Sequence, residues 1–217
     1  MTPLIHPTIT LNGIGFPSGS CYRGRMSLLP DLRPGQIGLV IGPRAERTMM
    51  LELSAQLALR GPVRVLDVGN SYNALYVARY LRRHTVQLNE ALNRISVARA
   101  FTCYQVVTLL AETACTEPAE VAVSPHPTLI LDLLATFYDE SVDVREAHRL
   151  LRDVVSQLHR LRRLAPVIIS LRPAPPHQPD RAGWHLPLEK IADHLLIREP
   201  VETAVCQPSL FQGSQHG

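Results

Sequence analysis

Short apolar runs of strand length alternate with segments of helical periodicity along most of the chain, and this alternation constrains the fold more than any other feature. Buried strands are expected at residues 36–41, 63–68, 95–98, 128–134 and 166–171, and helices at 48–59, 72–83, from Thr102 to about 113, and at 144–164. Strands that alternate with helices need crossover connections. The sequence therefore predicts an α/β fold, with a mostly parallel sheet covered by helices on both faces.

Segments rich in Pro, Gly and polar residues indicate how the chain is divided into a core and its flanking segments. Residues 1–34 are rich in Pro, Gly and Ser and are expected to be an irregular N-terminal segment. Residues 35–206 are expected to form one core domain that closes with a hairpin of residues 192–198 and 201–206, and the polar residues 207–217 to form a flexible tail. Gly61-Pro62 should end the first helix, and the Thr102 hydroxyl should cap a later one.

Composition narrows the choice of function classes. The net charge is +3, and 46% of the residues are hydrophobic, as in a globular protein. No apolar run approaches the ~20 residues of a membrane span, and no signal peptide is evident, so a cytoplasmic location is expected. The four cysteines form no CxxC pair and the histidines are scattered, which predicts no metal site. Cys103 and Cys115 are expected to be core thiols.

The turn after the first predicted strand has the position of a phosphate-binding loop but not its residues. Such a loop reads G-x-x-x-x-G-K-[ST]. Aligned on Gly42, its second glycine, lysine and hydroxyl become Arg47, Thr48 and Met49. Aligned on Thr48, the loop is one residue short, and Glu46 and Arg47 replace glycine and lysine. Glu46 would repel a phosphate, and the only lysine of the chain lies far away at position 190.

Three further segments resemble the core of RecA/RadA-type recombinases. Residues 64–72 (RVLDVGNSY) resemble the strand that ends in a D-T-E-G-T-F-like sequence in that family. Residues 95–102 (ISVARAFT) resemble the R-A-[FY]-[NT] run of the RadA branch, and residues 129–133 (LILDL) resemble a Walker B strand. The resemblance covers roughly residues 34–200, with the motifs in the order of the family, and it implies a RecA-like core. It does not extend to the N-terminal helical domain of RadA proteins.

The resemblance also assigns roles to residues, and most catalytic roles are unfilled. Asp132 matches the Walker B aspartate, which can order a magnesium-bound water. Gly69 stands where the family has its catalytic glutamate, and Leu171-Arg172 stand where it has a polar sensor. Phosphoryl transfer depends on such groups, so we expect little or no ATP hydrolysis. If ATP and magnesium bind at all, the expected contacts are Gly42, Pro43, Arg44, Arg47, Thr48 and Asp132.

Two basic surfaces are candidates for contact with DNA or an acidic partner. On a helical wheel, residues 144–164 place Arg145, Arg149 and Arg152 on one face and an apolar stripe on the other. That arginine face is either simply solvated or a contact for phosphate or carboxylate. The Pro-rich segment 172–187 takes the place of the recombinases' second DNA-binding loop. There, Arg172 and Arg181 accompany Trp184, which either stacks on a base or packs on the domain.

Three functions remain open from the sequence. The first is a non-catalytic RecA/RadA-like paralogue that acts as an accessory in DNA recombination or repair. Its expected partners are a recombinase, another paralogue or single-stranded DNA, within an oligomer or hetero-oligomer. The second is an ATP-binding RecA-like NTPase in which Arg44 or Arg47 supplies the phosphate charge. The third is a regulatory scaffold of the KaiC-like branch without chemistry of its own.

Overall fold

The fold is built on a single six-stranded sheet. The structure is a computed structural model that describes residues 34–115 and 126–198. All strand pairings within these residues are parallel, and the strand order is β3-β2-β4-β5-β1-β6. The strands are β1 (Ile37–Ile41), β2 (Val63–Asp67), β3 (Ile95–Arg99), β4 (Thr128–Leu131), β5 (Val167–Leu171) and β6 (His194–Ile197). The predicted α/β class with a parallel sheet is confirmed, and the protein is consistent with a Rossmann-like or P-loop-like fold.

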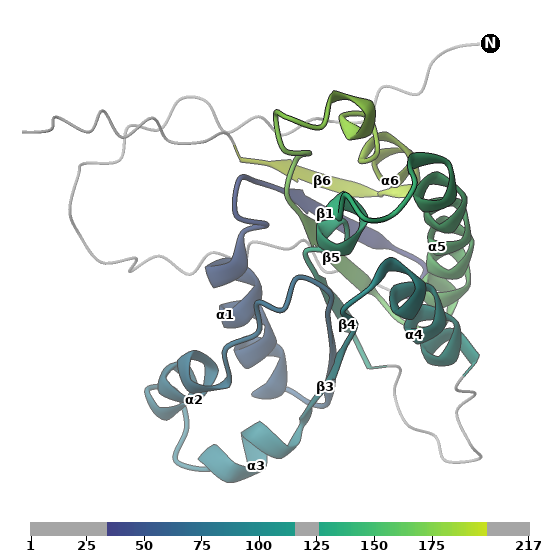
Figure 1. Cartoon of the computed structure of the whole chain (residues 1–217). Coiled ribbons are helices and arrows are strands. Elements are labelled where there is room, and N and C mark those ends of the chain that lie inside the picture. Colours follow the sequence, from purple (N-terminus) through teal and green to yellow (C-terminus); the bar gives the residue numbers. More distant parts are fainter. Residues whose placement is uncertain (1–33, 116–125, 199–217) are drawn as a thin grey trace, which may run out of the picture.

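Helices cover both faces of this sheet, as the alternation predicts (Figure 1). The helices α1, α2 and α3 pack on one core cluster, whereas α4, α5 and α6 pack on the other. Their bounds are α1 (Arg47–Ala58), α2 (Ala74–Arg82), α3 (Leu88–Asn93), α4 (Cys103–Cys115), α5 (Val144–Leu164) and α6 (Leu186–Ile191). Two 3₁₀ turns complete the described chain, η1 (Ala135–Tyr138) and η2 (Pro179–Arg181). Because both faces are covered, β1, β4 and β5 are buried along their whole length, which explains their unbroken apolar runs.

Local capping signals in the sequence explain where several helices begin and end. The backbone N–H of Gln105 donates to the Thr102 hydroxyl at 3.2 Å, so the predicted cap of α4 is confirmed. The Asp143 carboxylate accepts the backbone N–H groups of Arg145 and Glu146, which fixes the start of α5. The Gly61 N–H bonds back to the Leu57 carbonyl where α1 ends.

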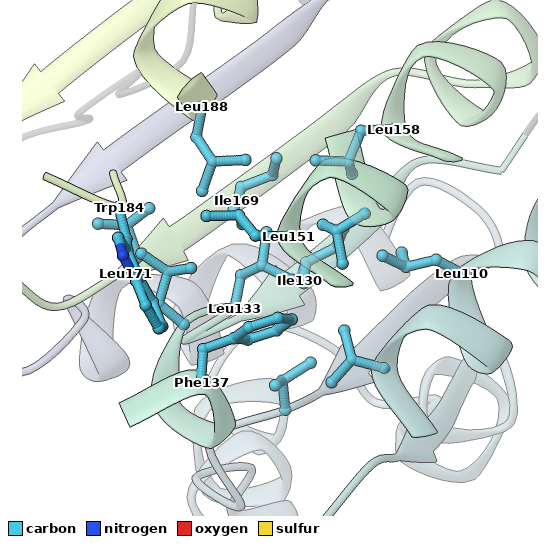
Figure 2. Packing of buried hydrophobic residues seen from close by; sticks show 14 of the residues in the cluster. Leu110, Ile130, Leu133, Phe137, Leu151, Leu158, Ile169, Leu171, Trp184 and Leu188 are labelled. Atoms are coloured by element: carbon cyan, nitrogen blue, oxygen red, sulfur yellow. The ribbon is translucent and has the colours of Figure 1, made fainter. Parts of the chain in front are cut away.

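The larger core cluster lies between the sheet and α4, α5 and α6. Figure 2 shows how Ile130 and Ile169 from the sheet meet Leu151 and Leu158 from α5. The apolar stripe expected on residues 144–164 is buried, and it consists of Ala147, Leu150, Leu151, Val154, Leu158 and Leu161. Their burial, at about 1.5–3 kcal/mol for each large side chain, holds α5 on the sheet.

Several expectations differ from the structure. Residues 172–187 are not one loop, because η2 and the start of α6 lie within them, and α3 also has no counterpart among the predicted helices. Cys103 is buried as expected, but Cys115 is exposed at the end of α4, so it is not a core thiol. The first segment of the predicted hairpin forms β6, which pairs with β1 in parallel, and its second segment, residues 201–206, lies outside the described residues. So do the tail and almost all of the N-terminal segment.

Candidate functional site at the carboxyl edge of the sheet

Backbone strain gathers where the strands end. The non-glycine residues with positive φ in the described chain are Ala45 (50°), Glu46 (44°), Asn70 (48°) and Asp132 (52°). All of them lie in the turns that follow β1, β2 and β4. Left-handed backbone costs roughly 1–2 kcal/mol for a residue with a side chain, and such strain concentrates at functional sites. Ligands of open parallel sheets also bind at this carboxyl edge, so it is the candidate site.

The turn after β1 folds its own carboxylate over the glycine of the expected phosphate loop. The Gly42 N–H donates to the Leu171 carbonyl at 3.1 Å, which ties the turn to the end of β5. The Glu46 side chain then bends back, and a Cβ on residue 42 would lie 2.6 Å from its Oε1. Arg198, just beyond β6, donates to Glu46 Oε2 at 2.5 Å. The Glu46 side chain is only 15% exposed. A phosphate entering this turn would therefore have to displace a carboxylate that Arg198 holds in place.

The other residues expected to contact nucleotide point elsewhere or into solvent. Arg47 donates from Nε to the Ser71 carbonyl at 2.6 Å, so its side chain bridges to the turn after β2. Pro43, Arg44 and Thr48 are exposed. The first turn of α1 has no side-chain cap, because its N-cap residue Glu46 makes no such hydrogen bond. The expected loop residues are thus close in sequence but do not converge on one point.

At the end of β4, an arginine holds the carboxylate that was expected to order magnesium. Asp132 is 2% exposed, and its own N–H donates to the Ser170 hydroxyl at 3.1 Å. Its carboxylate accepts the Arg172 backbone N–H at 3.3 Å, the Arg172 Nε at 2.6 Å, and the Arg172 Nη2. Hydrogen bonding to Asp132 raises the pKa of Arg172 further above its usual value. The Arg172 side chain, expected to face DNA or a partner, is 44% exposed but directs its guanidinium at Asp132.

The position of the expected catalytic glutamate has no room for a side chain. A Cβ on Gly69 would lie 2.6 Å from the Asp132 Cβ and 2.9 Å from its Oδ2. The neighbouring acid, Asp67, is fully buried and accepts the N–H groups of Ser71 and Tyr72 at 2.8 and 3.1 Å. Asp67 also accepts the Arg99 Nε at 3.0 Å. Asp67 therefore organises the turn after β2 and leaves no free carboxylate there.

The segment after β5 turns its aromatic and one of its arginines inward. Trp184 and Arg181 are each 5% exposed, and Figure 2 shows Trp184 among the core side chains beside Leu171. The Arg181 guanidinium lies 5.1 Å from the Trp184 ring centroid. The Tyr138 ring also stacks on Trp184, with 6.4 Å between the ring centroids. Arg181 also donates to the backbone carbonyls of Phe137, Asp139 and Val142.

These contacts correct the expectation that Arg181 reaches DNA, because its donors are used within the fold. Of the two interpretations of Trp184, packing on the domain is the correct one. Burial, with a further contribution from the Asp132 carboxylate, raises the pKa of the stacked Tyr138. The hydroxyl of Tyr138 donates to the Arg172 carbonyl at 3.2 Å, which links this segment to the end of β5.

The arginines of α5 lie where the helical wheel predicts. Arg145, Arg149 and Arg152 are exposed on the outer face of the helix. Arg149 is compensated, because it pairs with Glu146 at 2.8 Å and with Asp153 at 3.1 Å. Hydrogen bonding to Arg149 lowers the pKa of Glu146, and hydrogen bonding to Glu146 raises the pKa of Arg149.

A cavity of about 300 Å³ opens between the first turns of α4 and α5, but its chemistry does not suit a phosphate. Asp139, Asp143 and Glu146 contribute carboxylates to its lining, together with Thr102 and Tyr104. Its carboxylates already cap turns or pair with arginine. Within the described residues, no group of three or more His, Cys, Asp and Glu side chains is placed to hold a metal ion.

The residues at the carboxyl edge therefore do not fit a bound ATP–magnesium complex. Glu46 places a carboxylate at the turn that would cradle phosphate, and Arg172 occupies the carboxylate that would face magnesium. The unfavourable charge of Glu46 is evident from the sequence, whereas its partner Arg198, 152 positions away, is not. No signal in the sequence connects these two residues, because only the position of β6 beside β1 brings them together.

Comparison with known proteins does not assign the chain to a family. No protein-family model matches the sequence, and no curated protein matches it either. In the described part of the chain, no helix combines the length and the apolar composition needed to cross a bilayer. The class that the fold defines is an α/β protein with an all-parallel six-stranded sheet, which carries a strained, ion-paired site at its carboxyl edge.

Proposed function

We propose that this protein is a non-catalytic relative of the RecA/RadA-type recombinases that acts as an accessory or interaction protein in DNA recombination or repair. One observation carries the non-catalytic part. Two ion pairs of the chain itself, Glu46–Arg198 and Asp132–Arg172, lie at the carboxyl edge of the sheet. There, a nucleotide phosphate would need free positive charges and its metal would need a free carboxylate. With these charges satisfied internally, ATP binding would have to break both pairs.

The recombinase part rests on the order of the sequence motifs. The segments that resemble that family fall on β2, β3 and β4 of one parallel sheet. The strands β2, β4 and β5 are neighbours in this sheet, so Gly69, Asp132 and Arg172 meet at one edge. Such an arrangement is the one expected of a RecA-like core that has exchanged its catalytic groups for structural contacts. A protein of this kind works through partners, such as a recombinase or another paralogue.

Nucleotide binding and turnover test the non-catalytic part. A nucleotide present at 100 times its dissociation constant would stabilise the fold by ~2.7 kcal/mol, which for a chain of this size raises the melting temperature by about 5–10 °C. We expect no shift with ATP and magnesium, and no ATP hydrolysis with or without single-stranded DNA. ATP turnover at recombinase-like rates that is abolished by Asp132→Ala would contradict the proposal.

Capture of partners from cells that express the protein tests the accessory role. We expect a recombinase, a recombinase paralogue or another repair protein to be retained by the tagged full-length chain. The matched control is a variant in which Glu46 and Arg198 are exchanged (Glu46→Arg and Arg198→Glu), which keeps the net charge. Retention only of proteins unrelated to DNA would instead favour a regulatory scaffold.

A further inference from the structure

The outer face of α5 carries a continuous row of arginines. Four of them, Arg145, Arg152, Arg160 and Arg163, are exposed, and we call this set the α5 arginine stripe. From the first to the last, the stripe covers 18 residue steps, or roughly 27 Å at the helical rise of 1.5 Å per residue. Figure 1 shows α5 at the side of the molecule, on the opposite face of the sheet from α1, α2 and α3. The stripe is thus a long, straight surface held on a rigid element.

The charge of this stripe is not compensated by the described residues. Arg160 donates to Gln157 Oε1 at 3.2 Å and to Cys115 Sγ at 3.5 Å, and both partners are neutral acceptors. The other three arginines of the stripe have no side-chain hydrogen bond or ion pair within residues 34–115 and 126–198. The acids Glu146 and Asp153 on the same helix both pair with Arg149, which shares this face but is not counted in the stripe because its charge is compensated. Within the described residues, no acidic side chain neutralises these four positive charges.

The chemistry of the stripe fits a phosphate backbone better than a protein. Guanidinium groups match phosphate oxygens in bidentate geometry, and arginine is favoured for nucleic-acid recognition. A protein interface normally has an apolar core. On α5, the large apolar side chains that are exposed, Val144 and Leu164, lie only at its two ends. An acidic protein would find charge here but no central apolar contact.

The same surface favours a duplex over a single strand. Binding to single strands relies on aromatic side chains that stack on unpaired bases, and α5 contains no Phe, Tyr or Trp. The one tryptophan of the chain, Trp184, is buried and paired with Arg181. We propose that the α5 arginine stripe binds the phosphate backbone of double-stranded DNA without regard to sequence. This inference deepens the proposed accessory role in DNA metabolism, and it does not involve the nucleotide site.

Binding of the full chain to fluorescent 20-base-pair duplexes of unrelated sequence, measured without nucleotide, tests the inference. Each phosphate neutralised contributes about −0.9 to the slope of log affinity against log salt, so four contacts predict a slope near −3.6. The test variant is Arg152→Gln, Arg160→Gln, Arg163→Gln. We expect a slope near −1 and affinity at least about tenfold weaker at low salt, since three of the four contacts are removed.

The matched control is Arg60→Gln, Arg82→Gln, Arg83→Gln. These three arginines are also exposed, but they lie on the α1 and α2 side of the sheet, and their loss changes the net charge equally. We expect the control to keep the wild-type slope and affinity. Because all six side chains are exposed, we expect both variants to keep the wild-type melting temperature, which would show that they fold.

Several outcomes would overturn the proposal. Equal weakening in both variants would show that net charge, and not the stripe, governs binding. A wild-type chain that fails to bind duplex, or prefers a single strand of the same length, would exclude the duplex backbone as the ligand. Competition by polyglutamate as strong as that by duplex would point to an acidic protein. None of these results bears on ATP binding, so failure here is distinguishable from failure of the non-catalytic assignment.

Discussion

The two partners of the Asp132–Arg172 pair should be unequal in their effect on stability. The Asp132 carboxylate is 2% exposed, whereas 44% of the Arg172 side chain is exposed. Replacement of Arg172 by Met leaves a buried charge with only a backbone N–H at 3.3 Å. An uncompensated buried charge of this kind costs 3–5 kcal/mol, and we expect about 3 kcal/mol because water can reach the space that Arg172 vacates.

Replacement of Asp132 by Asn breaks the same pair at a lower cost. Asn tolerates the left-handed backbone at this position (φ 52°), and its carbonyl oxygen still accepts a hydrogen bond. Arg172 is half-exposed and is hydrated when its partner is neutral. The loss is then that of a charge-assisted hydrogen bond, about 1 kcal/mol after screening by solvent. The two single variants should differ by about 2 kcal/mol, or roughly 4–8 °C in melting temperature.

Urea and thermal unfolding of the two single variants and the double variant measure this asymmetry. The double variant should be about as stable as Asp132→Asn alone, because no buried charge remains once the aspartate is neutral. The resulting coupling energy isolates the interaction of the pair. The reasoning is refuted if Asp132→Asn costs as much as Arg172→Met, or if the double variant loses the sum of both effects.

Three further changes follow from the packing. Trp184→Ala should cost about 3–5 kcal/mol in urea unfolding, and the fluorescence of this single, buried tryptophan should not change when DNA is added. Gly69→Ala should cost about 1–3 kcal/mol by crowding Asp132, whereas Gly61→Ala, with open space around its Cβ, should be nearly neutral. Burial above all raises the pKa of Tyr76 to about 12, which absorbance at high pH can verify. Since the fold favours the neutral phenol, its contribution to stability is complete below pH 10 and is lost as the pH rises towards 12.

The local elements were largely predictable because their signals are local. The apolar period of α5 gave its bounds and its buried face, and the Thr102 hydroxyl marked the start of α4. Unbroken apolar runs identified β1, β4 and β5, since strands covered on both faces have no polar side. The helices α3 and α6 have only six residues each, too few for a helical period to be recognised.

The candidate site was predictable in its position but not in its contacts. The sequence by itself determined that the turn after β1 does not match a phosphate-binding loop and that the turn after β2 has glycine at position 69, because these are residue identities. Only the tertiary structure decided which charges neutralise one another. Arg172 reaches Asp132 because β5 lies beside β4, and Arg198 reaches Glu46 because β6 lies beside β1. Ion pairing depends on distance in space, and the order of strands in a sheet is set by packing of the whole chain, not by any local pattern.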